Sequence, residues 1–273
     1  MSADVRREAR RATGRALARS LTTFVLTLVA VVALWQLALW AFAVTPYVGK
    51  GPADVWEYLV SGEDASEHLA ELTGLLAVTL GHAAIGFAAG LVVALIAAMT
   101  FQLSRGIEAA LMPIAMLLRS VPLVAMAPVI ILIFGRDFWS VAVIGGIVVL
   151  FPALVNIVFG LRSTSPQMND LIAVYGGSAW TALVKVALPS SVPALLAAVR
   201  ISIPGAITGA LLAEWLAVGG GIGGSLGQFS ASAQFSALWA AVVLVTAAAL
   251  VLYNLVAVVE SVLLARMGMA GRA

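Results

Sequence analysis

Charged side chains lie inside long apolar stretches of this 273-residue sequence, Arg119, Arg200 and Glu214 among them. A charge at the centre of a lipid-spanning helix costs about 2.5–3.5 kcal/mol on insertion scales, so such residues usually serve a function or pair with a neighbour. A guanidinium can hold an anionic group through two parallel hydrogen bonds. Arg119 is therefore predicted either to contact an anionic solute, or to cap a broken helix or pair with a neighbouring residue.

Prolines and glycines accompany these charges. Prolines free backbone carbonyls, which need new partners in a membrane. Glu214 precedes the glycine-rich segment "GGGIGGSLGQFS", which either packs as an outer plug or is a flexible linker. For Glu214 and Arg200 we favour structural or gating roles, and for His82 a satisfied polar position between helices. The predicted residues of a substrate pathway or gate are Arg119, Pro122, Pro128, Glu214, Gly221 and Gly223.

The sequence contains none of the motifs expected of an intramembrane enzyme. There is no cysteine, no HExxH motif, and no serine in a GxSG motif of the intramembrane-protease type. The pair Gly49-Lys50 follows Val44, where a phosphate-binding loop has its first glycine, and precedes Gly51, where that loop has Ser or Thr. The chain is predicted not to be an enzyme and to hold no cofactor or metal.

The elements that position these residues follow from composition. Hydrophobic residues make up 62% of the chain and charged residues 10%, and the mean hydropathy is +1.08. A soluble domain has roughly 25% charged residues, so the solvent of this chain is lipid. Spanning takes about 20 apolar residues per helix. We predict an all-α integral membrane protein with about six transmembrane helices, near residues 21–43, 75–100, 108–134, 138–160, 192–217 and 237–264.

Charge asymmetry predicts the orientation. Residues 1–20 form a basic segment ahead of a single transmembrane domain, 21–273, and segments rich in Lys and Arg stay in the cytoplasm. Both termini and the loop at about 161–190 are then cytoplasmic, while 44–74, which is acidic, and 218–236 are external. We expect a multi-pass protein of a prokaryotic plasma membrane. The basic residues ahead of the first helix are Arg6, Arg7, Arg10, Arg11, Arg15 and Arg19.

The loop at 161–190 is longer than most connections and is therefore expected to carry function. In "DLIAVYGGSAWTALVKVALP" two short helices are predicted around Gly176-Gly177, with a cap at Ser178 and an end at Pro189. The second helix places an apolar face at Trp180, Leu183, Val184 and Ala187. A helix–glycine–helix elbow of this kind suits docking into a groove of another protein.

The same residues resemble the EAA loop of ABC importer permeases, in which an E-A-A triplet precedes a glycine by six residues and a Leu-Pro pair follows. Here Asp170 takes the glutamate position and Leu171-Ile172 the two alanines, while the glycine and the Leu-Pro pair match. The segments "LRSVPLVAMAPVIILIFG", "GPADVW", "TLGHAAIGFAAG" and "AEWLAVGGGIGGSL" resemble the nitrate/sulfonate/taurine branch. The predicted residues of the loop that couples to the ATPase are Asp170, Leu171, Ile172, Tyr175, Gly176, Gly177, Ser178, Trp180, Leu188 and Pro189.

The resemblance implies a permease subunit of a type I ABC importer that works by alternating access. Its implied partners are a second permease, identical or homologous, two cytoplasmic ATPase subunits that bind ATP and Mg, an extracytoplasmic solute-binding protein, the lipid bilayer and a small anionic or polar solute. No nucleic-acid partner is expected. The alternative is a secondary transporter or channel. Such a sequence would be expected to contain paired intramembrane acids or an inverted repeat, and neither is evident here.

Overall fold

The computed structural model describes residue 22 and residues 26–269, and the regular structure in them is helical. The described chain divides into two compact units, one formed by residues up to 68 with 233–240, the other by 69–232 with 241–273. The two longest helices each run through both units. The all-α fold class is confirmed; the division at residue 20 into a basic segment and one domain stays a prediction.

The smaller unit contains the helix Leu26–Ala41, the short helix α2 (Pro52–Trp56) and the π-helix η1 (Glu57–Ser61). Contacts of two tryptophan side chains in this unit position the first turns of the last helix. Trp35 stacks on Trp239 with ring centroids 5.5 Å apart, and the indole Nε1 of Trp239 donates a hydrogen bond to the carbonyl of Val48 over 2.9 Å. Stacked indoles of this kind stabilise packing beyond the area that they bury.

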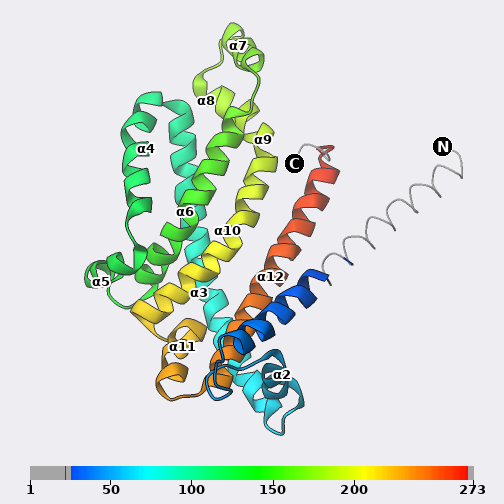
Figure 1. The fold of residues 1–273 in the computed structure, drawn as a ribbon. Coiled ribbons are helices and arrows are strands. Elements are labelled where there is room, and N and C mark those ends of the chain that lie inside the picture. The colour runs from blue at the N-terminus through cyan, green and yellow to red at the C-terminus, as the bar shows by residue number, and fades with distance from the viewer. Residues whose placement is uncertain (1–21, 23–25, 270–273) are drawn as a thin grey trace, which may run out of the picture. The chain divides into compact units, whose positions relative to one another are not determined.

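The larger unit is the helical bundle of Figure 1. Helices α6 and α10 pack against each other along most of their length, α7 to α9 lie at one end of the bundle, and α11 lies at the other. Its helices are α3 (Ala65–Leu103), α4 (Arg105–Ser120), α5 (Leu123–Phe134), α6 (Phe138–Arg162), α7 (Pro166–Val174), α8 (Ala179–Ala182), η2 (Leu183–Ala187), α9 (Leu188–Ser190), α10 (Val192–Ala213), η3 (Glu214–Val218), α11 (Gly221–Ala231) and α12 (Phe235–Arg266).

Glycines allow the central helices to approach closely. A Cβ atom on Gly86 of α3 would lie 2.7 Å from the Cα of Gly145 on α6, and one on Gly209 of α10 would lie 2.8 Å from the same atom. Gly145 is therefore held between two backbones, which is how small residues drive helix association in membranes. Larger residues at this crossing would push α3 and α10 away from α6.

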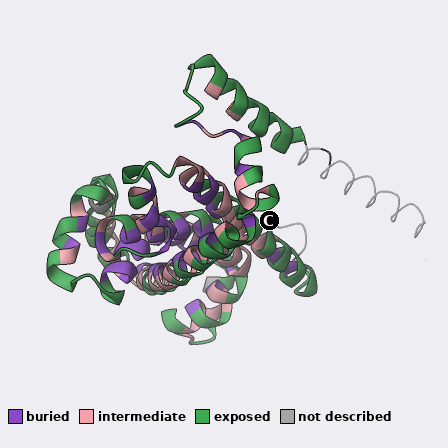
Figure 2. Cartoon of the chain, turned by 90° about the horizontal axis from the view of Figure 1, so that it is seen from below, coloured by how far each residue is buried: buried purple, intermediate pink, exposed green. Residues whose placement is uncertain are grey.

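Two apolar clusters fill the bundle on either side of this crossing. One, near α7 to α9, contains Phe101, Leu161 and Leu183, and the other, toward α11, contains Ile130, Ile144 and Ala213. Figure 2 shows that the buried residues gather inside the bundle, while outward surfaces of the helices are exposed. Exposed apolar surface on long helices is what a lipid environment requires.

Four helices are long and apolar enough to cross a membrane: α3, α6, the continuous run Val192–Val218, and α12. They correspond to four of the six predicted spans. The helices Leu26–Ala41 and Leu123–Phe134 are shorter and apolar, and lie within the other two. With 39 residues, α3 is about 58 Å long and begins ten residues before the predicted span.

Candidate functional site

The predicted span 108–134 is two helices, which is the main correction to the sequence analysis. Helix α4 ends at Ser120, and Pro122 is the N-cap residue of α5 with an extended backbone, ψ 118°. Proline disfavours the helical conformation of the residue before it, so the helix stops ahead of Pro122. Arg119 therefore lies in the last turn of α4, beside a break in the apolar run.

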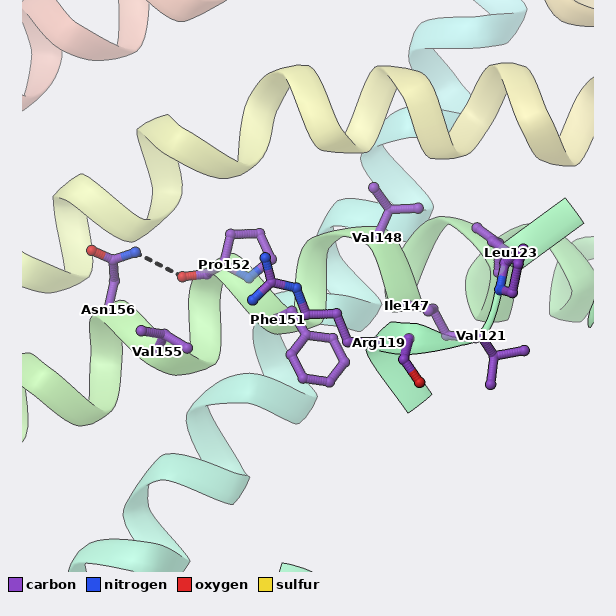
Figure 3. A pocket seen from close by; sticks show the side chains of 11 residues that line it. Arg119, Val121, Leu123, Ile147, Val148, Phe151, Pro152, Val155 and Asn156 are labelled. Carbon is purple, nitrogen blue, oxygen red and sulfur yellow. Dashed lines mark hydrogen bonds between the residues drawn. The ribbon is translucent and has the colours of Figure 1, made fainter. Parts of the chain in front are cut away.

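A cavity of about 590 Å³ opens at this break. Figure 3 shows Arg119 pointing toward the face of α6 that carries Phe151 and Pro152. Within the part of the chain that the structure describes, Arg119 makes no ion pair or hydrogen bond through its side chain. The Asn156 amide donates to the carbonyl of Pro152 over 2.8 Å. The lining residues are Arg119, Ser120, Val121, Pro122, Leu123, Ile147, Val148, Phe151, Pro152, Val155 and Asn156.

This arrangement brings together two of the predicted pathway residues, Arg119 and Pro122, and leaves Pro128 out. Pro128 lies inside α5, exposed and away from the cavity lining. Arg119 is exposed, and its unpaired guanidinium stands among mostly apolar walls, where it can orient an anionic group. The structure shows Arg119 in the cavity wall without a pairing partner among the described residues, and its role stays a prediction.

Glu214 forms a second site, directly after the last residue of α10. Its side chain is fully buried. Oε2 accepts hydrogen bonds from the Thr79 hydroxyl over 2.9 Å and from the backbone N–H of Gly223 over 2.8 Å, and Oε1 lies 2.8 Å from Nδ1 of His82. A buried carboxylate is stable only when its oxygens are satisfied in this way.

The carboxylate of Glu214 fastens the start of α11 to α3. The Thr79 hydroxyl also accepts a hydrogen bond from the N–H of Ile222 over 2.8 Å. A Cβ atom on Gly221 would lie on the Glu214 carboxylate, and one on Gly223 would lie 2.8 Å from the Cα of Leu211. Glu214, Gly221 and Gly223 thus belong to one site, and the glycine-rich segment is a packed helix rather than a linker.

Two partners of Glu214 come from α3. His82 is the satisfied polar residue between helices that its surroundings predict. Thr79 was missed by the sequence analysis, because a single threonine in an apolar helix most often bonds to its own backbone. The available signal was the spacing of Thr79 and His82, three residues apart, which places both on one face of α3.

The segment 161–190 has the predicted elbow. Helix α7 ends at Val174, and Gly176 adopts a positive φ of 75°. Gly176 N–H donates to the carbonyl of Ala173 over 3.0 Å and Gly177 N–H to that of Ile172 over 2.8 Å. These two bonds form a Schellman motif, which satisfies the last carbonyls of a helix and favours glycine in the left-handed position.

The second glycine is the more crowded of the pair. A Cβ atom on Gly176 would meet nothing within 4 Å, whereas one on Gly177 would meet the side chain of Ile172 and lie 3.0 Å from its carbonyl oxygen. The next helix begins at Ala179, where the Ser178 hydroxyl accepts from the N–H of Thr181 over 3.3 Å, as predicted for a cap. Gly176 is constrained by backbone angle and Gly177 by space.

The second helix of the elbow does not present the four-residue apolar face that the sequence predicts. Leu183 and Ala187 are buried in the bundle, while Trp180 and Val184 are exposed. The π-helical turn η2 contains Leu183, Val184 and Ala187 and shifts the helical register, so these residues and Trp180 do not share one free face.

The sequence predicts that the second helix ends at Pro189, but the helical run continues past this residue. Pro189 stands in the first turn of α9, and the helical run ends at Ser190. Proline is tolerated in a first helical turn, where its missing N–H leaves no bond broken.

Exposed apolar side chains remain around the elbow. Val174 is 84% exposed and Tyr175 83%, and Leu171 and Trp180 are more than half exposed. Asp170 is exposed and makes no ion pair with another described residue. Leu188 is half-buried, and Pro189 is exposed. The elbow thus exposes four apolar side chains, those of Leu171, Val174, Tyr175 and Trp180.

Comparison with known proteins agrees with this arrangement. The family model of the binding-protein-dependent transport system inner membrane component matches residues 90–267, more than half of the chain. The matched region contains the Arg119 cavity, Glu214, and the elbow.

Individual relatives are permeases. A protein of Haemophilus influenzae that carries the name ABC transporter permease protein is 30% identical over 59% of this chain and 63% of its own length. A formylaminopyrimidine transport permease protein of Halalkalibacterium halodurans is 28% identical over 44% of this chain and 48% of its own. An aliphatic sulfonates transport permease protein of Bacillus subtilis is 28% identical over 61% of this chain and 59% of its own. The chain thus matches about half to two thirds of the length of these relatives.

Proposed function

We propose that this chain, which belongs to the binding-protein-dependent transport system inner membrane component family, is the transmembrane permease subunit of an ATP-driven importer. It forms a path for a small anionic or polar solute across a prokaryotic plasma membrane. Separate ATPase subunits bind ATP and Mg and drive alternating access, and a solute-binding protein delivers the solute from outside. A second permease, identical or homologous, completes the path.

The observation that carries the coupling role is the exposed apolar elbow at 171–180. Its backbone is fixed by the Schellman motif and its base is anchored by Leu183 in the core of the bundle. A rigid elbow with Val174 and Tyr175 exposed can transmit movement of a docked partner to α6 and α10, which flank it in the chain. We infer that the ATPase covers these two side chains.

The solute class rests on Arg119 and its cavity of about 590 Å³. The relatives named for sulfonates and for formylaminopyrimidine differ in the charge of their solutes, so their names do not select a class for this chain. An unpaired guanidinium in the cavity wall favours a solute with an anionic group, such as a sulfonate, a carboxylate or nitrate.

Docking at the elbow is tested by co-purification of the ATPase with the solubilised permease. Val174→Asp places a charge in the proposed apolar interface and is expected to lower the recovered ATPase at least about tenfold, since burying an unpaired charge is costly. Val60→Asp, an equally simple change of an exposed valine in η1, is the matched control and keeps the ATPase. Equal recovery of ATPase with both variants would contradict the proposal.

A further inference from the structure

A second and larger cavity, of about 780 Å³, lies toward the end of the bundle that carries α7 to α9. It shares Asn156 with the cavity of Arg119. The α6 residues that line the two cavities come in adjacent pairs that recur every four positions, at 147–148, 151–152, 155–156 and 159–160, and the C-cap residue Ser163 follows. This spacing places them on one face of the helix, so the two cavities follow each other along α6.

The second cavity also holds one arginine. Arg200 of α10 and Glu260 of α12 both line it, and Nε of Arg200 lies 3.2 Å from Oε2 of Glu260. Glu260 is 4% exposed, while the side chain of Arg200 keeps 33% of its surface exposed. The guanidinium of Arg200 also lies 5.8 Å from the ring centre of Tyr253. Arg200 is therefore anchored by a buried acid and an aromatic ring rather than extended toward the membrane surface.

The pairing leaves part of the guanidinium available. A guanidinium has five N–H donors, and the contact with Glu260 involves the Nε edge. The terminal nitrogens of Arg200 form no hydrogen bond to another residue in the described ranges 22 and 26–269. Around them the wall is small or apolar, with Pro193, Ala194 and Ala197 on α10. An anion in this cavity would therefore meet the guanidinium of Arg200, whose charge is partly offset by the carboxylate of Glu260.

We infer that Arg200 is a second anion-contact residue of the path, toward the α7 to α9 end, and that Glu260 weakens its hold on the anion. The inference rests on the proposed function and adds a residue to it. A path that conducts needs sites that attract the solute without retaining it, and a competing carboxylate beside the second arginine supplies that balance. Arg119 binds the anionic group first, and Arg200 receives it before release.

A cysteine reporter tests the charge of the second cavity. The native chain has no cysteine, so Ser163→Cys places a single thiol in the cavity wall of the assembled transporter. The rates of modification by 2-sulfonatoethyl and by 2-(trimethylammonium)ethyl methanethiosulfonate are compared in inside-out vesicles. Arg200→Gln is expected to lower the anionic-to-cationic rate ratio about threefold or more, and Glu260→Gln to raise it by a similar factor, since each removes one charge near the thiol.

Protection tests binding itself. Millimolar ethanesulfonate is expected to slow modification of the thiol by the anionic reagent, which competes with it for Arg200, and choline at equal concentration is not. Arg200→Gln abolishes this protection, whereas Arg200→Lys retains part of it. Loss of assembly in Arg200→Gln still leaves Glu260→Gln, which keeps the arginine and is expected to strengthen protection. A purely structural Arg200–Glu260 pair predicts no protection in any variant, even where the rate ratio changes with the charge that is removed, and absence of protection would overturn the inference.

Failure of the proposed Arg200 contact can be distinguished from failure of the proposed importer function. ATP-driven uptake by the transporter with native Arg200 and Glu260 is measured separately, in liposomes with ATP inside and the solute with its binding protein outside. Uptake without protection at Ser163→Cys removes only the second contact, whereas absence of ATP-driven uptake removes the importer itself.

Discussion

Arg119 is the residue that most directly faces the proposed path, because its guanidinium is unpaired at the break between α4 and α5. Arg119→Gln keeps a polar side chain but removes the charge. A hydrogen bond to a charged group contributes about 1.5–3 kcal/mol, so we expect uptake of an anionic solute to fall roughly tenfold to a hundredfold. The measurement is uptake into liposomes with the amount of assembled complex held equal.

Arg105→Gln, an exposed arginine in the first turn of the same helix, is the matched control and should transport normally. Normal uptake in Arg119→Gln would remove Arg119 from the path. Failure of the complex to assemble would instead assign Arg119 to helix capping.

A second prediction for a single residue concerns Glu214 and the thermal stability of the permease. Glu214→Gln keeps the shape of the side chain but replaces one acceptor oxygen with an NH2 donor, which then faces Thr79, Gly223 or His82. A buried donor left without an acceptor costs about 1–3 kcal/mol. We expect the melting temperature of the purified permease to fall by several degrees, and the exposed Glu67→Gln on α3 to leave it unchanged. Equal melting temperatures would mean that the carboxylate does not fasten α11.

The sequence identifies single charged residues better than their partners. Arg119 and Glu214 stand out because charge is rare in apolar runs, and both line or form sites. Glu260 was missed as a partner of Arg200, since nothing in the spacing of α10 relates it to a residue sixty positions later. Partnership between distant helices depends on how they pack, which the intervals along the chain do not encode.

At the scale of elements, the elbow between α7 and α8 gives the clearest prediction. Gly176 has a positive φ, which costs a residue with a side chain about 1–2 kcal/mol and a β-branched residue more. Gly176→Val is therefore expected to insert normally in the membrane but to lose the ATPase, or to hydrolyse ATP without transport. The measurement combines pull-down of the ATPase with solute-stimulated hydrolysis in liposomes.

Ala179→Val, at the start of α8, introduces the same side chain at an exposed helical position and serves as the control. Full retention of docking and stimulated hydrolysis in Gly176→Val would show that the elbow is not the coupling element. Gly177→Val is expected to have a comparable effect, because its side chain would meet that of Ile172.

Turns were predicted well and interruptions of helices poorly. The glycine pair and the cap at Ser178 have local causes, so their residue types were enough. The break at Pro122 and the continuation past Pro189 involve the same residue type with opposite outcomes. Pro122 follows a complete helix, whereas Pro189 enters a first turn after a π-helical segment. Which outcome occurs depends on the hydrogen bonds of the preceding turn, and a hydropathy pattern does not contain that information.

For the whole molecule, composition was sufficient to predict an all-helical membrane protein, because a chain with 10% charged residues cannot cover a water-facing surface. The packing of α3, α6 and α10 at Gly86, Gly145 and Gly209 was not predicted. Glycines are frequent in the chain, and only the crossing geometry distinguishes those that allow close approach from the others.

The most direct test of the account is the energy source of transport. The permease is reconstituted in liposomes with its ATPase and solute-binding protein, and uptake of radiolabelled solute is followed with ATP, with a non-hydrolysable ATP analogue, and with an imposed proton or sodium gradient alone. The account predicts uptake only with hydrolysable ATP, and only when the ATPase is present. Uptake that is driven by an ion gradient in the absence of the ATPase would contradict it and would identify a secondary transporter.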